Sequence, residues 1–417
     1  MKVSRLAANL IGSEIIKIGN EVNELKAKGA EIANLTIGDL NSELYPIPEL
    51  LKKGIQESYQ NNLTNYPPAN GLLSLRKAVS KDLKNRWNLD YSENEILVSG
   101  GSRPLIYAAY RTIVDEGDKV VYPVPSWNNN HYTYLTSGEK IEVETSVDHN
   151  FLPTAAELKP HLEGAVLLAL CSPLNPTGTM FSQQQLSEIC ELVLEENRRR
   201  SPEEKPLYIL YDQIYAMLTF DQEHFNPVSL FPELREYTVF IDGISKCFAA
   251  TGVRVGWSFG PPEIIHHMKS LLGHVGAWAP KPEQESVAQF LNKSQEVDLF
   301  VNDFKQKIKE SLQTLHLGIQ DMKSKGYKTD SIQPMGALYL TIALNYIGAV
   351  KPDGQQIGNS SDLVFYLIQE AGVALVPFSA FGNSENMAWF RASAGGLSKN
   401  EIQDLFPRLE KALSQLV

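Results

Sequence analysis

The spacing of hydrophobic and polar positions changes twice along the chain. In the first stretch, apolar residues at helical spacing predict a helix between Ser13, a suitable N-cap, and Gly29, a suitable terminator. A short strand that ends at Gly38 is expected next, followed by helices that begin near Pro48 and around residues 72–83. Helical spacing therefore dominates the first stretch of the chain.

From residue 95 onward, short runs rich in β-forming residues alternate with longer stretches of helical spacing. The runs are EILVSGG, DKVVYPVP, KIEVETS, AVLLALCSP, LYILYDQIY and TVFIDGIS. Alternation of this kind predicts an α/β fold with a largely parallel sheet. Right-handed crossovers bring the loops that follow the strands to one end of the sheet, which is where open α/β sheets bind ligands.

The spacing of hydrophobic positions changes again near residue 285, and we expect a second, smaller α+β domain from there to the C-terminus. Its predicted elements are a long helical stretch to about residue 319, a strand around residues 337–344, a helix around residues 362–371, short strands in VALVPF and WFRASAG, and a closing helix at residues 399–416. The N-terminal segment is expected to join this domain. We therefore predict a large domain at residues 46–285 and a small domain formed by residues 1–45 and 286–417.

Composition and charge narrow the possible partners. The 417 residues carry a net charge of −11 with a sequence pI near 5.3, and no basic run exceeds Arg198–Arg200. Nucleic acid and anionic membranes are therefore not expected as partners. Three scattered cysteines predict neither a disulfide framework nor a zinc site, and no metal ligand set is expected. Without a signal-peptide pattern or an apolar run of about 18 residues, the sequence predicts a soluble, cytoplasmic protein.

Candidate chemistry centres on TVFIDGISKCFAATGVRVGW, residues 238–257. Lys246 follows the turn at the end of a buried strand, and Arg254 comes eight residues later among small residues. A desolvated lysine needs a partner, and one such partner is a carbonyl with which the amine forms a Schiff base. The arginine would suit a phosphate. A solvated Lys–Arg pair is the alternative for this pattern alone.

Residues at four other strand ends complement this pair. The small residues of SGGSRP, residues 99–104, could gather backbone N–H groups around an anion at a helix start, although a plain turn needs them equally. Trp127 offers a flat face for a ring or for simple packing. Asn175 is held in an Asn-Pro turn and could aim its amide beyond the sheet. Asp212 either caps the next helix or holds a proton on a ring nitrogen.

Together these groups meet the needs of one cofactor, pyridoxal 5′-phosphate. It requires a phosphate cradle, a platform for its ring, a hydrogen bond to its ring oxygen, an ionised carboxylate at its pyridine nitrogen and a lysine amine for its aldehyde. The ordered set GGS, PSW, NPTGT, D-x-x-Y, SK and R-x-G resembles that of the class I and II aminotransferases, which are fold type I pyridoxal-phosphate enzymes. The resemblance covers nearly the whole chain, from LTIGDL to WFRAS.

The resemblance implies a fold like that of aspartate aminotransferase, with a mostly parallel seven-stranded sheet flanked by helices in the large domain. It also implies which residues hold the cofactor. These are Lys246 as the Schiff-base lysine, Asp212 at the pyridine nitrogen, Asn175 and Tyr215 at the ring oxygen, Trp127 against the ring, and Gly101, Ser102, Arg103 and Arg254 around the phosphate. Of these, Lys246, Asp212 and Tyr215 are implied to be catalytic.

Substrate binding and assembly are implied in the same way. Arg391 matches the arginine that takes the substrate α-carboxylate by a two-pronged hydrogen bond, with Gly38 and Asn175 beside it. Tyr66, in NYPPANG, matches a tyrosine that reaches the cofactor phosphate of a neighbouring subunit, which implies a homodimer with shared active sites. The implied substrates are an L-amino acid and a 2-oxo acid.

The sequence departs from the family pattern at three places. The serine or threonine usual three residues before the lysine is Gly243 here, and Asp242 before it would add negative charge near a phosphate. The histidine that backs the aspartate in some members is Asn130 here, with His131 beside it. Residues 273–282, where some relatives place an arginine for a second carboxylate, contain none, which argues against a narrow preference for aspartate.

Three functions remain open from the motifs. The first is an aminotransferase that uses Lys246 for the proton shift. The second is a lyase or an aminocyclopropanecarboxylate-synthase-like enzyme on the same fold, because the same carbanion chemistry serves both. The third is a cofactor-binding sensor domain without catalysis, which the acidic charge and the early start of the family-like segment disfavour.

Overall fold

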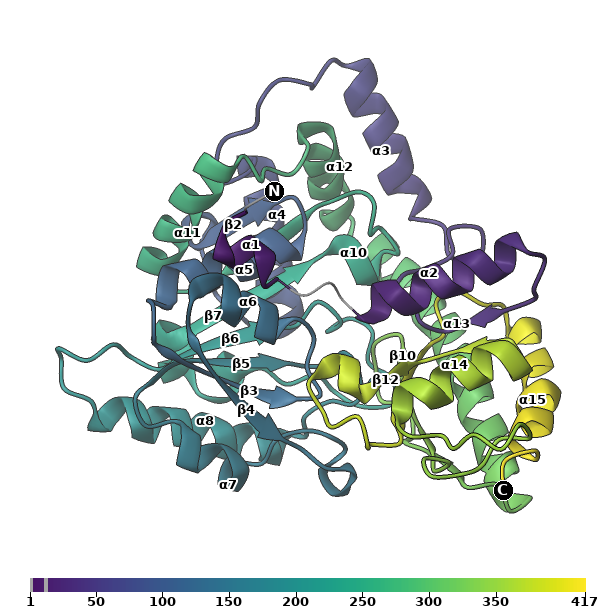
Figure 1. Ribbon diagram of the computed structural model, residues 1–417. Coiled ribbons are helices and arrows are strands. Elements are labelled where there is room, and N and C mark those ends of the chain that lie inside the picture. The colour runs from purple at the N-terminus through teal and green to yellow at the C-terminus, as the bar shows by residue number, and fades with distance from the viewer. Residues whose placement is uncertain (1–2, 11–13) are drawn as a thin grey trace.

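The computed structural model describes residues 3–10 and 14–417, and it arranges them as two sheet-based domains side by side (Figure 1). Ser13, the expected N-cap, lies outside the described residues. The helix after it, α2 (Glu14–Ala27), ends two residues before Gly29, which has a positive φ of 89°. The predicted N-terminal helix is therefore confirmed at its C-terminal end.

The large domain is built on a seven-stranded sheet with the order β2-β8-β7-β6-β5-β3-β4. Its strands are β2 (Ile96–Ser99), β3 (Lys119–Val124), β4 (Glu139–Glu144), β5 (Ala165–Cys171), β6 (Tyr208–Asp212), β7 (Thr238–Gly243) and β8 (Gly256–Phe259). Neighbours from β7 to β4 pair in parallel, whereas β8 is antiparallel to both β7 and β2. The predicted α/β fold with a mostly parallel sheet is confirmed.

Strand β8 is the one that the alternating pattern did not reveal. It follows β7 without a long crossover helix, and four residues are too few for a recognisable period. Its first residue, Gly256, lies opposite Ser99 of β2 and Gly243 of β7. A Cβ on Gly256 would come 2.6 Å from the Gly101 carbonyl carbon, and a Cβ on Gly243 would come 2.7 Å from Gly256 Cα. Glycines therefore let β8 enter the sheet.

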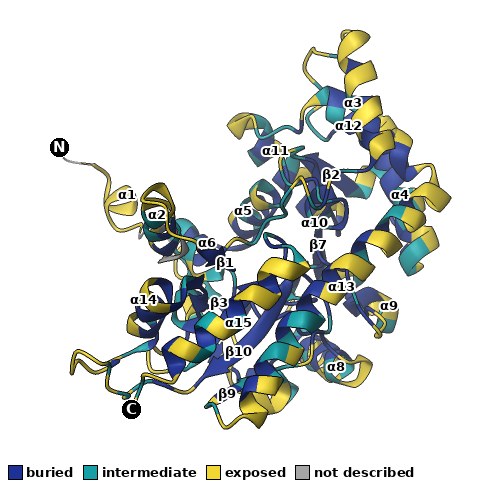
Figure 2. Ribbon diagram, turned by 90° about the vertical axis from the view of Figure 1, so that its right-hand side faces the viewer, coloured by how far each residue is buried: buried dark blue, intermediate teal, exposed yellow. Residues whose placement is uncertain are grey.

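Helices cover both faces of this sheet. They are α3 (Glu49–Gln60), α4 (Leu73–Trp87), α5 (Ser102–Ile113), α6 (Asn129–Thr136), α7 (Ala155–Leu158), α8 (Gln183–Arg199), α9 (Pro227–Leu230), α10 (Ile244–Cys247), α11 (Pro262–Val275) and α12 (Lys281–Leu291). Figure 2 shows the strands as buried and the outer helices as buried on one side and exposed on the other. Burial on both faces explains why the strand sequences are continuous apolar runs.

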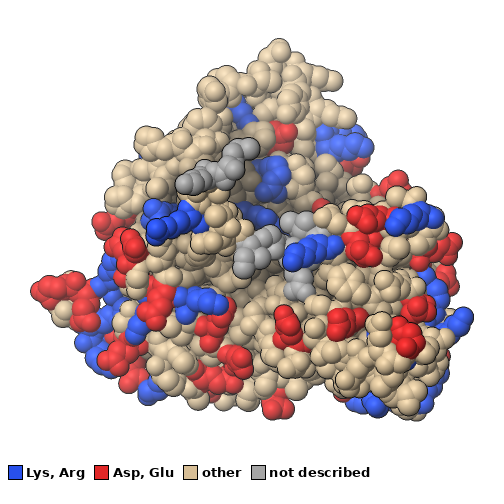
Figure 3. All heavy atoms as spheres, viewed as in Figure 1, with Lys and Arg blue, Asp and Glu red and all other residues tan. Residues whose placement is uncertain are grey.

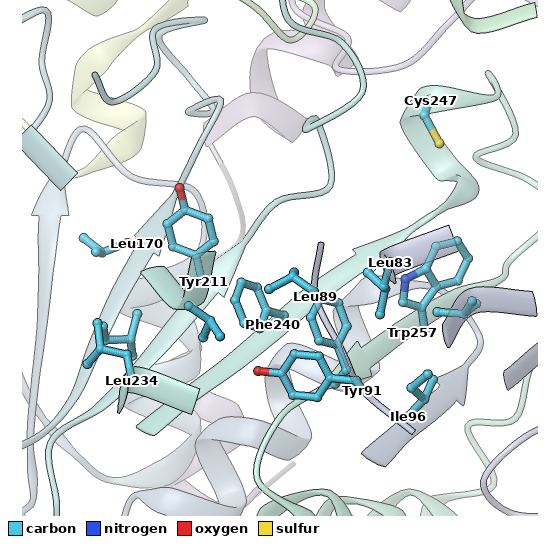
Figure 4. Close-up of a cluster of buried hydrophobic side chains, with 14 of the residues drawn as sticks. Leu83, Leu89, Tyr91, Ile96, Leu170, Tyr211, Leu234, Phe240, Cys247 and Trp257 are labelled. Carbon is cyan, nitrogen blue, oxygen red and sulfur yellow. The ribbon is translucent and has the colours of Figure 1, made fainter. Parts of the chain in front are cut away.

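The two faces of the sheet form two separate hydrophobic cores. In β7, Val239 and Ile241 pack with α5 and α11, whereas Phe240 packs on the opposite side with α4, α8 and α12. Figure 4 shows Phe240 in this second core with Tyr91 and Tyr211, whose ring centroids lie 6.2 and 5.9 Å from that of Phe240. Because its side chains alternate between the two cores, β7 is fixed in orientation, and α10, which carries Lys246, therefore leaves the sheet at a defined place.

The smaller domain combines a four-stranded sheet of order β12-β13-β10-β9 with a parallel pair of β1 and β11. Its elements are β1 (Ala33–Asn34), β9 (Thr329–Ser331), β10 (Tyr339–Leu344), β11 (Val373–Ala374), β12 (Val376–Pro377), β13 (Trp389–Ser393), α13 (Ser294–Ser324), α14 (Ser360–Ala371) and α15 (Lys399–Leu413). Strand β1 of the N-terminal segment pairs with β11, which supports the assignment of this segment to the smaller domain; the domain bounds stay a prediction. Strand β9 was not predicted.

The long helix α13 connects the two domains. Near its start, Val297 and Val301 pack into the core that contains Phe240, whereas Phe304 and Ile308 pack into the core of the smaller domain. The boundary predicted at residue 285 falls within α12, which packs against α3 and α4. We propose that the domains divide within α13, between the two pairs.

Shorter elements complete the description. The N-terminal α1 (Arg5–Ala8) rests on α6, where the Tyr134 hydroxyl donates to Leu6 O at 3.0 Å. Short 3₁₀ helices occupy residues 93–95, 147–149, 159–161, 232–237 and 378–381. No helix in the described part of the chain is long and apolar enough to cross a membrane.

Candidate active site

The carboxyl ends of the parallel strands open into a cavity of about 420 Å³ between the two domains. Figure 3 shows a hollow on this face of the molecule, with Lys and Arg side chains inside it. All but two of the predicted site residues line the cavity: Gly38, Ser102, Arg103, Trp127, Asn175, Asp212, Tyr215, Lys246, Arg254 and Arg391. The exceptions are Gly101, which lies behind Arg254, and Tyr66.

Lys246 lies on the single turn of α10, directly after β7. Its Nζ donates to the carbonyl oxygen of Gly38 at 2.6 Å. Burial lowers the pKa of this amine to about 8, and the nearby arginines Arg391 and Arg254 act in the same direction, while Asp39 opposes them. A lysine near half-ionisation at neutral to mildly alkaline pH can act as a nucleophile and as a base.

Asp212 ends β6, next to Cys171 in the register of β5 and β6. One carboxylate oxygen accepts the Ile214 backbone N–H at 3.1 Å, but residues 214–217 form a turn, so the alternative that Asp212 caps the next helix is wrong. The side chain also lines the cavity. Burial raises the pKa of this carboxyl to about 6, and the Ile214 N–H and the charge of Lys246 limit the rise. That Asp212 would hold a proton on a ring nitrogen stays a prediction.

Arg391 reaches the cavity from β13 of the smaller domain and is almost fully buried. Its guanidinium donates to Asn175 Oδ1 at 3.0 Å and to Thr36 O at 2.6 Å, which joins residues from three distant parts of the chain. It also lies against the rings of Tyr339 and Phe381, with Cζ 4.7 and 5.0 Å from their centroids. Stacking on two rings leaves the planar fork oriented for a carboxylate.

On the opposite side of the cavity, Arg254 and Gly101 form a cradle. Arg254 donates to Gly100 O at 2.9 Å and to Thr251 O at 2.6 Å. Gly101 has a φ of 95°, and a Cβ there would lie 2.1 Å from Arg254 Nη2. Ser102 follows as the first residue of α5, where backbone N–H groups and the helix dipole favour an anion.

Two departures from the family pattern, Gly243 and Asp242, leave the cradle of Arg254 and Gly101 intact. Gly243 has no room for a serine side chain, because a Cβ would also come 3.0 Å from Val255 O. Asp242 does not line the cavity; it accepts from Gln213 Nε2 at 3.1 Å and from its neighbour's N–H at 2.7 Å. Burial raises the pKa of Asp242 to about 7. The expected negative charge therefore points away from the cradle.

Among the described residues, neither Asn130, which replaces the histidine of some relatives, nor the neighbouring His131 makes a hydrogen bond to Asp212. Asn129 lines the cavity instead. Its amide donates to Ser126 Oγ at 2.6 Å and its oxygen accepts from Tyr110 at 2.8 Å. This residue orders the loop that carries Trp127.

Two further contacts at the site were not anticipated from the sequence. The hydroxyls of Tyr215 and Tyr339 lie 2.8 Å apart. Asp39 accepts from Thr251 Oγ1 at 2.7 Å, which ties the N-terminal segment to the loop that holds Arg254. A tyrosine within the otherwise aliphatic run of β10 was the available signal for Tyr339, whereas nothing local pointed to the Asp39 contact.

Tyr66 is the predicted site residue that this chain does not bring to the cavity. Its side chain is 82% exposed and meets Trp278 edge to face at 5.2 Å. It lies in a separate surface hollow, together with Lys281. Whether it serves another subunit's site stays a prediction.

The residues of the cavity fit pyridoxal phosphate. The cradle at Gly101 and Arg254 is one that a Cβ would fill, and it offers a cation beside a helix start. Lys246 and Asp212 are a half-buried amine and a half-buried carboxylate in the same cavity. Arg391 has a buried Nε with no partner among the described residues, so the site retains a donor for an incoming anion.

The cavity at the strand ends contains a lysine and several arginines, and one of these, Arg391, comes from the smaller domain. This arrangement is typical of an α/β enzyme that binds an anionic cofactor. Residues 30–409 match the family model described as aminotransferase class I and II. The chain therefore belongs to that family, which depends on pyridoxal phosphate, and it is an aminotransferase.

Individual relatives agree with this assignment. The chain is 27% identical over 407 residues to an aspartate aminotransferase of Bacillus sp. (strain YM-2), which covers 96% of each chain. It is 28% identical to a probable aspartate/prephenate aminotransferase of Rhizobium leguminosarum bv. phaseoli, covering 96% of this chain and 95% of the relative. The aspartate aminotransferase structure from Rhizobium meliloti aligns with a TM-score of 0.91 at 25% identity over 100% of both chains. The predicted family is thus confirmed, and the aminotransferase is favoured over the lyase and the sensor.

Proposed function

We propose that this enzyme transfers an amino group between an L-amino acid and a 2-oxo acid with pyridoxal phosphate attached to Lys246. The observation that carries the proposal is that Lys246, Asp212 and Arg391 come from three distant segments and line one cavity. When bound, the cofactor supplies an electron sink for the charge that forms at the substrate Cα. One amino acid becomes a 2-oxo acid in the first half of the cycle, and the reverse occurs with a second pair.

The protein groups have complementary tasks in this proposal. Asp212 holds a proton on the ring nitrogen, and Asn175 and Tyr215 bond the ring oxygen. The amine of Lys246 would move the proton at the substrate Cα, for which a pKa near 8 is suitable. Arg391 exchanges its bond to Thr36 O for the α-carboxylate of the substrate.

We further propose that a dicarboxylic acid is one of the substrates. Lys246, Arg254 and Arg391 each donate to backbone or side-chain oxygens, whereas Arg103 has no hydrogen bond to another described residue. Its guanidinium lies 5.1 Å from the centroid of Trp127, the expected ring platform. Because Arg254 already occupies the phosphate cradle, we assign Arg103 to a second carboxylate. The relatives named as aspartate aminotransferases support this assignment, although residues 273–282 supply no arginine.

The proposed assembly is a homodimer in which Tyr66 completes the partner's site. Its support is the exposure of this side chain and its position outside the cavity of its own chain. A large exposed tyrosine ordered against Trp278 is suited to contact a second copy.

The decisive experiment traps the cofactor on the chain. After incubation with pyridoxal phosphate and reduction with borohydride, peptide mass spectrometry should find the added mass on the peptide that contains Lys246. Lys246→Ala should abolish both this label and turnover, whereas Lys77→Ala, an exposed lysine of α4, should change neither. Full labelling or normal turnover in Lys246→Ala would overturn the proposal. An amino acid added alone should yield its 2-oxo acid without free ammonia, which separates transamination from lyase chemistry.

A further inference from the structure

Two buried tyrosines meet in the cavity from different domains. Tyr215 follows β6 in the large domain, and Tyr339 is the first residue of β10 in the smaller one. Their hydroxyl oxygens lie 2.8 Å apart, and their rings meet edge to face with centroids 5.7 Å apart. Both side chains are at least 97% buried and both line the cavity. The sequence assigned a role to Tyr215 but none to Tyr339.

A hydrogen bond between two hydroxyl groups has one donor, and the surroundings decide which group it is. Tyr339 makes no other side-chain hydrogen bond in the part of the chain that the structure describes. Gly38 faces its hydroxyl and offers no side chain, because a Cβ there would lie 2.6 Å from the hydroxyl oxygen. The Tyr215 hydroxyl likewise has no other hydrogen bond among the described residues, so each hydroxyl has only the other as its partner.

The nearby charges indicate which hydroxyl donates. The Arg391 guanidinium lies over the Tyr339 ring, with Cζ 4.7 Å from its centroid. Burial raises the pKa of both phenols, but the charge of Arg391 opposes the rise for Tyr339, whereas the Asp212 carboxylate adds to the rise for Tyr215. Tyr339 is thus the more acidic phenol and the better donor. The Tyr215 hydroxyl accepts, and its own proton is left free to point elsewhere in the cavity.

We propose that Tyr339 is a positioning residue, which donates to Tyr215 and thereby directs and strengthens the Tyr215 hydroxyl as a donor to the ring oxygen of bound pyridoxal phosphate. This inference rests on the proposed function. The physical basis is that hydrogen bonds in a chain polarise one another, so a hydroxyl that accepts a bond becomes a stronger donor. The smaller domain, through Tyr339, then helps set the electronic state of a cofactor held by the large domain.

The test is a pH titration of the absorbance of the lysine-bound cofactor in the holoenzyme. A donor to the ring oxygen withdraws charge from it and so weakens its hold on the proton of the lysine–cofactor linkage. Tyr215→Phe should therefore raise the pH midpoint, and Tyr339→Phe should raise it by a smaller amount, about 0.5 pH unit. The double variant should match Tyr215→Phe alone, because Tyr339 acts only through that residue. KM should change little in Tyr339→Phe, since the ring under Arg391 remains.

A second measurement does not depend on removing the hydroxyl. Replacing Tyr339 by 3,5-difluorotyrosine makes it a more acidic donor and should shift the midpoint downward. Tyr366→Phe is the matched control. This buried tyrosine of the smaller domain does not line the cavity and donates to Ala412 O at 2.8 Å, so loss of its hydroxyl should leave the midpoint unchanged.

The outcomes separate this inference from the proposed function. If the wild-type protein forms no lysine-bound absorbance band, the proposed function fails and the role of Tyr339 fails with it. If the wild-type band titrates normally but Tyr339→Phe leaves the midpoint unchanged, or adds its full shift to that of Tyr215→Phe, the role of Tyr339 alone is overturned.

Discussion

Replacing Gly101 by alanine tests the phosphate cradle without touching a charged group. The new Cβ would lie 2.1 Å from Arg254 Nη2 and 2.7 Å from Cζ, so the guanidinium must leave its bonds to Gly100 O and Thr251 O. A charge-assisted hydrogen bond contributes about 1.5–3 kcal/mol, and losing one to the phosphate weakens cofactor binding by roughly 10- to 150-fold. The positive φ of 95° adds a folding cost of about 1–2 kcal/mol.

The assay is an equilibrium titration of cofactor-free protein with pyridoxal phosphate, followed by the absorbance of the bound cofactor, together with Tm values in both states. Gly117→Ala is the matched control, because Gly117 has a φ of 84° but no heavy atom within 4 Å of its would-be Cβ. It should lose a similar amount of stability and keep full cofactor affinity. If Gly101→Ala binds the cofactor within twofold of the wild type, Arg254 does not hold the phosphate and the cradle is misassigned.

Three further predictions follow from the site. In Asp212→Asn, the cofactor-free protein should be more stable than the wild type above pH 6, by at most about 3 kcal/mol, while turnover falls at least about 100-fold. The variant gains stability because the pKa of Asp212 in the folded protein, about 6, exceeds the ordinary value of 3.8, so ionisation of this carboxyl destabilises the folded state. In thermal melts the gain in stability should vanish below about pH 4, where the carboxyl is protonated in both states. A gain that persists below about pH 4 would contradict this explanation. Gly243→Ser should lower Tm and stability by about 2 kcal/mol or more, since its Cβ meets the backbone of Gly256 and Val255, and a stable variant would show that β8 can shift. Arg103→Met should reduce kcat/KM about 10- to 100-fold for dicarboxylic donors but little for apolar ones. An equal loss of kcat/KM for all donors, together with weaker cofactor binding, would show that Arg103 binds the cofactor phosphate instead.

Much of the fold was predictable because it depends on short-range pattern. In TVFID the three central residues are apolar without alternation, as in a strand buried on both faces. In the structure Phe240 packs in one core, and its neighbours Val239 and Ile241 pack in the opposite core. The turn after such a strand must reach the rim of the sheet, so Lys246 and Asp212 could be expected to meet. Strands β8 and β9 escaped prediction because their sequences, GWSF and TDS, contain no aliphatic residue, unlike the equally short β2 (ILVS).

The sequence by itself determined which residue types stand at the strand ends, because the order of strand, turn and helix is written in local periodicity. It could not determine which side chains touch, since the lateral order of strands and the packing of one domain on the other depend on the whole core. The contact between Arg391 and Asn175 spans 216 positions, and that between Tyr215 and Tyr339 spans 124. Such contacts depend on the free energy gained when the surfaces of the two domains are buried against each other, and no local sequence pattern indicates that free energy.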